Sequence, residues 1–229
     1  MILPWTILCV GTVNLSARSC PTPRLEPKPI ILGFAGWTLP LTSYHGSAVE
    51  QIIDRLRAEG ASAEIYPPND WPTVAERLTN HADADRPIVL LGFSMGAAAA
   101  IHVAQKLGAV GIPVRNIVMV EAWNPEPIPA NVAAATHFYS TRFAGLIRPG
   151  PGNEGLVENI DLNGQIPEIE TASHVAMSQM ALVQDLVIDK AGVRDDKDQA
   201  GTTVAAKSRS LCRDATVAPR RRTPPAPKR

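Results

Sequence analysis

The chain has few cysteines, no long hydrophobic run and no glycine-rich phosphate loop. Cys9, Cys20 and Cys212 are its only cysteines, and no pair of them has the spacing of metal ligands, which argues against a disulfide framework and a cysteine metal site. The mostly apolar stretch at residues 1–13 is too short to span a bilayer. Without ligand clusters or a phosphate-cradling loop, no metal and no organic cofactor is expected.

The chain has no net charge, but its charges are unevenly distributed. Residues 192–229 contain ten Lys and Arg against four Asp and Glu, whereas residues 1–191 contain 12 against 18. The tail lacks hydrophobic periodicity and cannot bury enough apolar surface to offset the entropy of ordering. We therefore expect residues 192–229 to be a disordered basic tail, with no specific nucleic-acid partner.

Residues 1–28 are an apolar segment followed by a proline-rich linker. No Lys or Arg occurs before Arg18, so the positive region of an export signal is missing. A small residue precedes Cys20, as in a lipoprotein cleavage site, but Ala17 stands where such sites usually carry Leu. The absence of a positive region and of the usual Leu favours a cytoplasmic location over export or lipid anchoring. Between the two terminal segments, residues 29–191 are expected to form one globular domain.

Strand-like and helix-like runs alternate along this domain. The expected strands are residues 29–34, 63–66, 88–91, 116–121, 136–140 and 156–161, and the expected helices are residues 47–60, 73–81, 96–107 and 175–190. Ser47 and Gly60 are typical residues at the start and end of a helix, and Gly108 is expected to end the alanine-rich helix. The alternation predicts an α/β fold, a three-layer α/β/α sandwich with a mostly parallel sheet.

The pentapeptide Gly-Phe-Ser-Met-Gly at residues 92–96 lies between a predicted strand and the alanine-rich helix. The pattern alone arises by chance in about one chain in ten of this length, so its setting gives it weight. A serine on a sharp turn between strand and helix projects its hydroxyl off the backbone, and flanking glycines relieve crowding there. Ser94 is therefore a candidate nucleophile, and a strand–turn–helix with an incidental serine is the alternative.

The histidine that would serve as base is expected on a loop at the carboxyl end of a later strand. His174 meets this expectation, because it follows the last predicted strand and begins the last predicted helix. His45 lies in the loop after the first strand and could line the mouth of a site. His81, His102 and His137 lie in helices or in a strand. A surface or helix-capping role is the alternative for His174.

A carboxylate is also needed, to hold the imidazole in one tautomer and to stabilise the imidazolium. Glu121 ends the predicted strand at residues 116–121, and a carboxylate in so apolar a run requires a partner. Glu154, Glu158 and Asp161 are rival candidates, whereas residues 141–145 contain no acid.

With serine, acid and histidine in this order, residues 29–190 resemble the α/β-hydrolase superfamily, specifically its small thioesterase-like and esterase-like members. The resemblance implies an oxyanion hole formed by the amide of Met95 and one from the loop after the first strand. In that loop Gly-Trp is similar to the His-Gly-Trp of simple esterases, with Ala35 in place of the histidine, so Trp37 is favoured and Phe34 is the alternative.

The chain departs from the superfamily pattern in two ways. Most members carry the acid after the next strand, but thioesterase domains of polyketide assembly lines resemble this chain in carrying it one strand earlier, which favours Glu121 and thioester substrates. The usual first two strands are missing unless residues 1–25 form them, and no helical cap follows Glu121. A minimal fold with a shallow, open site is therefore expected.

The resemblance implies a serine hydrolase that cleaves a small-molecule acyl ester or thioester through an acyl-serine intermediate, without a cofactor. A carboxylesterase or lipase acting on oxygen esters is one alternative, and a noncatalytic binding module with the same fold is another. Arg142 and Arg148 could attract a phosphate or carboxylate of the substrate, although solvated surface arginines are the more common case.

Overall fold

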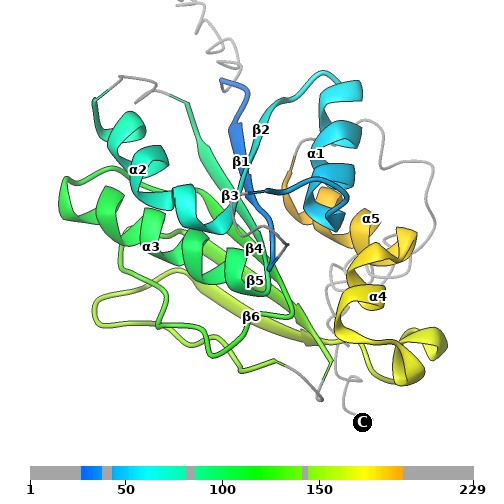
Figure 1. Ribbon diagram of the computed structural model, residues 1–229. Coiled ribbons are helices and arrows are strands. Elements are labelled where there is room, and N and C mark those ends of the chain that lie inside the picture. Colours follow the sequence, from blue (N-terminus) through cyan, green and yellow to red (C-terminus); the bar gives the residue numbers. More distant parts are fainter. Residues whose placement is uncertain (1–26, 38–42, 81–85, 141–143, 193–229) are drawn as a thin grey trace, which may run out of the picture.

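The computed structural model describes residues 27–37, 43–80, 86–140 and 144–192, and these residues form a single parallel sheet flanked by helices (Figure 1). The strands are β1 (Ile30–Phe34), β2 (Ser62–Tyr66), β3 (Ile88–Phe93), β4 (Asn116–Val120), β5 (Ala134–Tyr139) and β6 (Leu156–Asp161). They lie in the order β2-β1-β3-β4-β5-β6, and every pairing is parallel. The predicted α/β fold class is confirmed.

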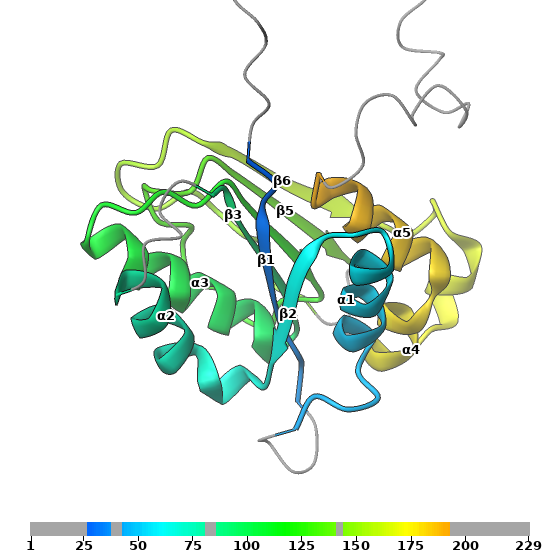
Figure 2. The ribbon, with the colours of Figure 1, turned by 90° about the horizontal axis from the view of Figure 1, so that it is seen from above.

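Helices cover both faces of the sheet (Figure 2). They are α1 (Ala48–Ala58), α2 (Trp71–Asn80), α3 (Met95–Ala109), α4 (His174–Gln179) and α5 (Ala181–Lys190), with 3-10 turns η1 (Pro68–Asp70) and η2 (Pro167–Thr171). Helices α2 and α3 pack on one face, and α1, α4 and α5 on the other, so the core consists of two hydrophobic clusters separated by the sheet. This is the three-layer arrangement that the alternation of elements predicts.

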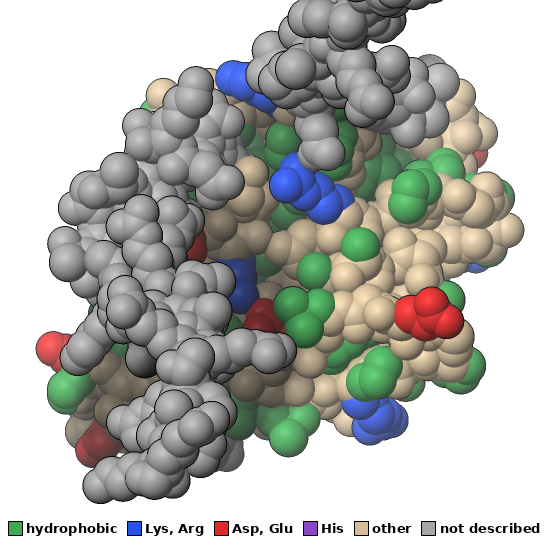
Figure 3. Space-filling model, turned by 180° about the vertical axis from the view of Figure 1, so that it is seen from behind, with side chains coloured by type: hydrophobic (Ala, Val, Ile, Leu, Met, Phe, Trp, Pro, Cys, Tyr) green, Lys and Arg blue, Asp and Glu red, His purple; other side chains and the backbone are tan. Residues whose placement is uncertain are grey.

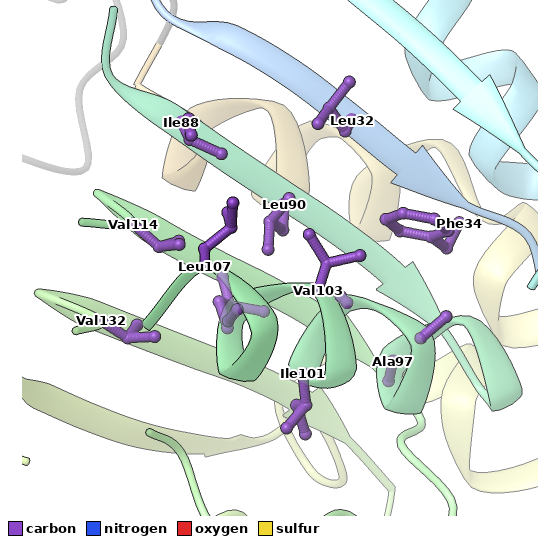
Figure 4. Close-up of a cluster of buried hydrophobic side chains, with 14 of the residues drawn as sticks. Leu32, Phe34, Ile88, Leu90, Ala97, Ile101, Val103, Leu107, Val114 and Val132 are labelled. Atoms are coloured by element: carbon purple, nitrogen blue, oxygen red, sulfur yellow. The ribbon is translucent and has the colours of Figure 1, made fainter. Parts of the chain in front are cut away.

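The alanine-rich helix α3 packs closely on the central strands. Leu32 and Leu90 of β1 and β3 meet Val103 and Leu107 of α3, and all four side chains are fully buried (Figure 4). Each such side chain contributes about 1.5–3 kcal/mol when it is removed from water. The strand that precedes Ser94 and the helix that follows it are therefore anchored in the same cluster.

The carboxyl ends of the central strands lie level with one another. Phe34 pairs with Gly92, Phe93 with Val120, and Val120 with Phe138. Because the chain leaves each strand at the same edge, the loops after β1, β3, β4 and β5 meet there.

The predicted final helix at residues 175–190 is wrong, because this segment forms two helices. Met180 between α4 and α5 has an extended backbone, with φ −67° and ψ 128°. The Ser178 hydroxyl donates to the carbonyl of Val175 at 2.8 Å, and the Met180 N–H donates to the carbonyl of Met177 at 3.2 Å. These short-range bonds close α4 after six residues, and the break contains neither proline nor glycine that could have signalled it.

The predicted stop of α3 at Gly108 is also wrong. The helix continues to Ala109, and Gly111, with φ 77°, is the residue that ends it. The Gly111 N–H donates to the carbonyl of Gly108 at 3.1 Å, and the Ile112 N–H donates to that of Leu107 at 2.9 Å, which is a Schellman motif. Gly108 instead provides space, because a Cβ there would lie 2.7 Å from Oδ1 of Asn131.

Other boundaries differ from the prediction by one or two residues: β2 begins at Ser62, β3 extends to Phe93 and β5 runs from Ala134 to Tyr139. Helix α2 begins at Trp71 rather than residue 73, because η1 leads directly into it. Strand β4 ends at Val120, so Glu121 lies just beyond it. The predicted helix end at His81, the three cysteines, the segment 1–26 and the tail from residue 193 lie outside the described residues.

The described residues on the back of the molecule, as oriented in Figure 1, show no large patch of one charge sign. Where that face is not covered, charged side chains are scattered singly among hydrophobic ones (Figure 3). None of the helices in the described ranges combines the length and the apolar character that crossing a membrane would require.

Candidate active site

Ser94 lies on a strained turn between β3 and α3. Its backbone has φ 54° and ψ −115°, a conformation that costs a residue other than glycine about 1–3 kcal/mol. The Ser94 N–H donates to the carbonyl of Val120 at 3.0 Å, so β4 supports the turn. Ser94 itself is half-buried, as a nucleophile at the mouth of a site would be.

The two glycines of the pentapeptide allow the start of α3 to lie against β1 and β3. A Cβ on Gly92 would lie 2.5 Å from the Cα of Ala97, and a Cβ on Gly96 would lie 2.0 Å from the carbonyl oxygen of Phe34. Neither contact can be relieved by a side-chain rotation, because both involve backbone atoms. The geometry therefore requires glycine on both sides of Ser94, which is the structural meaning of the sequence pattern.

Glu121 follows β4 and is fully buried, with a φ of 50°. Its Oε1 accepts a hydrogen bond from the Ser140 N–H at 2.5 Å, and its Oε2 lies 3.0 Å from Nδ1 of His174. The Glu121 N–H donates to the carbonyl of Phe138 at 2.9 Å. The end of β5 therefore holds both the backbone and the carboxylate of Glu121.

His174 is the first residue of α4, and its ring is held from two sides. Nδ1 faces Glu121, and the ring stacks on Phe93, with centroids 4.8 Å apart and planes at 29°. Phe93 directly precedes Ser94, so this stacking brings the imidazole to the serine turn. A hydrogen bond to a carboxylate selects the tautomer with the proton on Nδ1, and Nε2 is then the basic nitrogen, directed away from Glu121.

The rival acids have other surroundings. Glu158 pairs with Lys190 at 2.8 Å, and this hydrogen bond lowers the pKa of the Glu158 carboxyl. Asp161 accepts a hydrogen bond from the N–H of Asn163 at 2.9 Å, and Glu154 is exposed. Of the four predicted candidates, Glu121 is the one whose carboxylate contacts His174.

Two other histidines are paired with carboxylates other than Glu121. His45 is paired with Glu50 at 3.1 Å, and His102 with Glu126 at 3.2 Å. His81 lies outside the described residues.

The loop after β1 lies against the serine strand. The Ala35 N–H donates to the carbonyl of Tyr66 at 3.0 Å, and a Cβ on Gly36 would lie 2.6 Å from the ring of Phe93. Phe34 ends β1 and its side chain is fully buried. Gly36 therefore lies against Phe93, the residue before Ser94, and Trp37 follows Gly36 directly in the chain.

Four of the eight exposed large apolar side chains of the described residues lie at or next to candidate site residues in the sequence. Trp37 is 66% exposed, Met95 42%, Trp123 65% and Val175 57%. Met95 follows Ser94, Trp123 follows Glu121 by two residues, and Val175 follows His174. By contrast, Arg148 is an exposed residue, and Arg142 lies outside the described residues. Large exposed apolar side chains therefore adjoin Ser94, Glu121 and His174 along the chain.

No sequence motif pointed to a role for His137, which is fully buried in β5. Its Nε2 lies 2.9 Å from the N–H of Ala122, and its Nδ1 lies 3.3 Å from Oδ1 of Asn159. Burial lowers the pKa of His137 from its ordinary value of 6.5, and the Asn159 hydrogen bond and the charge of Glu121 only partly offset this effect. The one signal in the sequence is a histidine placed within a strand-like run.

Comparison with known proteins gives one family match. Residues 48–215 match the family model of the thioesterase domain. No curated protein sequence matches the chain.

Several solved structures are similar at low sequence identity. The thioesterase domain that cyclises the lipopeptide antibiotic surfactin is 15% identical, with 77% of this chain and 93% of that chain covered and a TM-score of 0.43. A thioesterase of the prodiginine biosynthetic pathway in Streptomyces coelicolor is 14% identical, with 82% and 98% covered and a TM-score of 0.40. A type II thioesterase of the yersiniabactin pathway is 11% identical, with 72% and 94% covered and a TM-score of 0.39.

Proposed function

The chain belongs to the thioesterase-domain family and is a hydrolase of acyl thioesters or esters, and from this premise we propose that Ser94, His174 and Glu121 are its catalytic triad. Ser94 is the nucleophile, His174 the general base and acid, and Glu121 the carboxylate that orients the imidazole.

The reaction passes through an acyl-serine. Nε2 of His174 accepts the proton of the Ser94 hydroxyl while Oγ of Ser94 attacks the carbonyl carbon of the substrate. The amides of Met95 and Trp37 stabilise the resulting oxyanion, with the Phe34 amide as the alternative to Trp37. His174 then gives its proton to the departing thiolate or alkoxide, and the same residues activate a water molecule that releases the acid.

The observation that carries the proposal is the contact between Glu121 and His174. The carboxylate is fully buried, and its two oxygens meet the Ser140 N–H at 2.5 Å and the imidazole at 3.0 Å. A buried carboxylate is stabilised only when such partners are present, and a partner that is a histidine next to a strained serine turn supports a working role. A noncatalytic binding module would not need this arrangement.

The apolar residues next to the site support a preference for an apolar acyl group. Trp37, Met95, Trp123 and Val175 each lie within two residues of a proposed site residue in the chain and expose a large apolar side chain. Burial of an acyl chain against such side chains gains about 0.8 kcal/mol per CH₂ group. Longer saturated acyl thioesters should therefore have lower KM values than acetyl thioesters.

The Ser94→Ala substitution tests the nucleophile. We expect kcat for an octanoyl thioester, and for the oxygen ester with the same acyl group, to fall about 10⁴- to 10⁶-fold, because the covalent route is lost and only substrate binding and oxyanion stabilisation remain. Ser62→Ala in β2 is the matched control and should retain activity. A serine-directed fluorophosphonate probe should label the Ser62→Ala variant but not Ser94→Ala. Unchanged turnover in Ser94→Ala would overturn the proposed nucleophile.

The Glu121→Gln substitution tests the acid. It preserves the shape of the side chain but removes the charge that favours the Nδ1–H tautomer, so kcat should fall about 10²- to 10⁴-fold with little change in KM. Asp161→Asn, a change of the same kind at a rival acid, should remain near wild-type activity. If the two variants behaved in the opposite way, Asp161 would be the acid.

A further inference from the structure

We propose that His137 is a positioning residue for the reaction: its neutral imidazole holds the peptide between Glu121 and Ala122, and so aims the Glu121 carboxylate at His174. This inference rests on the proposed role of Glu121. His137 does not contact the substrate, so it acts only through this turn.

The Glu121 turn needs to be held because its backbone is strained and its side chain is redirected. Alternation along β4 would place the Glu121 side chain on the face of Met119, which is packed under α3. The φ of 50° at Glu121 instead lets the carboxylate reach Ser140 and His174 at the edge of the sheet. A conformation that costs about 1–3 kcal/mol persists only when neighbouring groups fix it.

Three groups from the end of β5 provide this fixation. The carbonyl of Phe138 accepts from the Glu121 N–H, the N–H of Ser140 donates to its carboxylate, and Nε2 of His137 accepts from the next amide, Ala122, at 2.9 Å. His137 is therefore the side-chain member of the set. Most superfamily members carry the acid itself after the strand that corresponds to β5. In this chain the acid follows β4, and the end of β5 supplies the groups that hold it.

The hydrogen bonds around His137 fix its tautomer. Because the Ala122 N–H is a donor, Nε2 must be the unprotonated acceptor and Nδ1 must carry the proton. Nδ1 faces Oδ1 of Asn159 at 3.3 Å. The orientation of the Asn159 amide is fixed in turn, because Oδ1 accepts from the Ile147 N–H and Nδ2 donates to the Ile147 carbonyl, both at 2.9 Å.

An imidazolium at this position would direct an N–H at the N–H of Ala122. The burial that disfavours protonation of His137 is consistent with a side chain that works only in its neutral form. Its ring also stacks on Tyr139, with centroids 5.5 Å apart, which leaves it one orientation. His137 thus belongs to a buried network in which both ring nitrogens and the Asn159 amide have partners.

The test is a double-mutant cycle with two substitutions of His137. His137→Leu removes the acceptor, whereas the amide oxygen of His137→Gln can take the place of Nε2. We expect His137→Leu to lower kcat about 10- to 100-fold with KM within about twofold, and His137→Gln to recover most of the loss. In the Glu121→Gln background, His137→Leu should lower kcat by less than about twofold, because the charge it helps to position is already absent.

Several outcomes would overturn the inference. Equal losses of kcat from His137→Leu with and without Glu121→Gln would show that His137 is only a structural residue. Unchanged kcat in Glu121→Gln alone would reject the proposed acid itself, so the two failures are distinguishable. If His137→Leu does not fold, ¹⁵N NMR of the wild-type protein decides: a proton on Nε2 of His137 contradicts the proposal, and a proton on Nδ1 with a bare Nε2 supports it.

Discussion

At the scale of single residues, backbone strain is concentrated at the ends of two neighbouring strands. Ser94 after β3 and Glu121 after β4 both have positive φ values, 54° and 50°, although neither is glycine. Each conformation costs about 1–3 kcal/mol and is held by hydrogen bonds from the adjacent strand. The third described residue of this kind is Asn124, with a φ of 41°, and asparagine adopts positive φ more readily than serine or glutamate.

The Gly96→Ala substitution tests how tightly the serine turn is packed. The new Cβ would lie 2.0 Å from the carbonyl oxygen of Phe34, so the start of α3 must move away from β1. We expect a loss of about 1–3 kcal/mol in the free energy of unfolding, measured with urea, and at least a tenfold loss of kcat.

Gly111→Ala at the other end of α3 is the matched control for Gly96→Ala. Gly111 has a φ of 77° and open space around it, so alanine there should cost about 1–2 kcal/mol through backbone strain alone. Its kcat should be unchanged. Equal kcat losses in both variants would mean that helix stability, not the position of the Ser94 turn, controls activity.

Local sequence patterns were enough to propose Ser94, His174 and Glu121, but not the contacts around them that depend on strand register. Ser94 and His174 follow from a motif and from chain order, and Glu121 from the absence of acids at residues 141–145. The positive φ of Glu121 and its contact with the Ser140 N–H arise from how β4 and β5 are aligned, which no local pattern encodes. The network of His137 has the same origin, because His137 and Asn159 are register partners on β5 and β6.

At the scale of elements, strands and amphipathic helices were predictable, because burial of one face dictates the spacing of apolar residues along the sequence. The buried run of β3 and the serine cap of α1 both lie where the sequence indicates. The break at Met180 was not predictable, because neither proline nor glycine marks it and the bonds that close α4 are made by Ser178 and by the backbone of Met180. The break matters for the site, since it makes α4 a short helix whose first residue is His174.

The serine caps of α1 and α4 allow a matched test of whether α4 positions the base. Ser47 accepts from the Glu50 N–H and Ser173 from the Ala176 N–H, both at 3.1 Å. Removal of either cap should cost about 1 kcal/mol of helix stability. We expect Ser173→Ala to lower kcat several-fold, because α4 has only six residues and begins at His174, while Ser47→Ala leaves kcat unchanged. Similar activity in both variants would show that His174 is held by Glu121 and Phe93 alone.

At the scale of the whole molecule, the parallel sheet brings together residues that are far apart in the chain. Ser94, Glu121 and His174 follow β3, β4 and β6 respectively, and right-handed parallel connections return each chain segment to the same edge. The sheet order β3-β4-β5-β6 is enough to bring these segments to one edge, which is why the order of a few motifs along the sequence could suggest these three residues.

The pH dependence of global stability gives a test of the buried histidine that does not depend on activity. The pKa of His137 in the folded protein is lower than its ordinary value of 6.5, mainly because of burial. Between these two pKa values the unfolded chain binds a proton that the folded protein rejects, so the free energy of unfolding rises with pH. The stability contributed by neutral His137 is therefore complete above about pH 6.5 and is lost as the pH falls below that value.

His137→Gln removes this titration, and the other four histidines titrate in both proteins. The free energies of unfolding of the wild type and of His137→Gln, measured with urea, should differ by a constant amount above about pH 7. This difference should shift against the wild type between about pH 6.5 and pH 5, because only the wild type loses stability through His137. A difference that stayed constant over this range, or moved in favour of the wild type, would mean that folded His137 accepts a proton as easily as an exposed histidine, and the Ala122 N–H would then lack its acceptor under mildly acidic conditions.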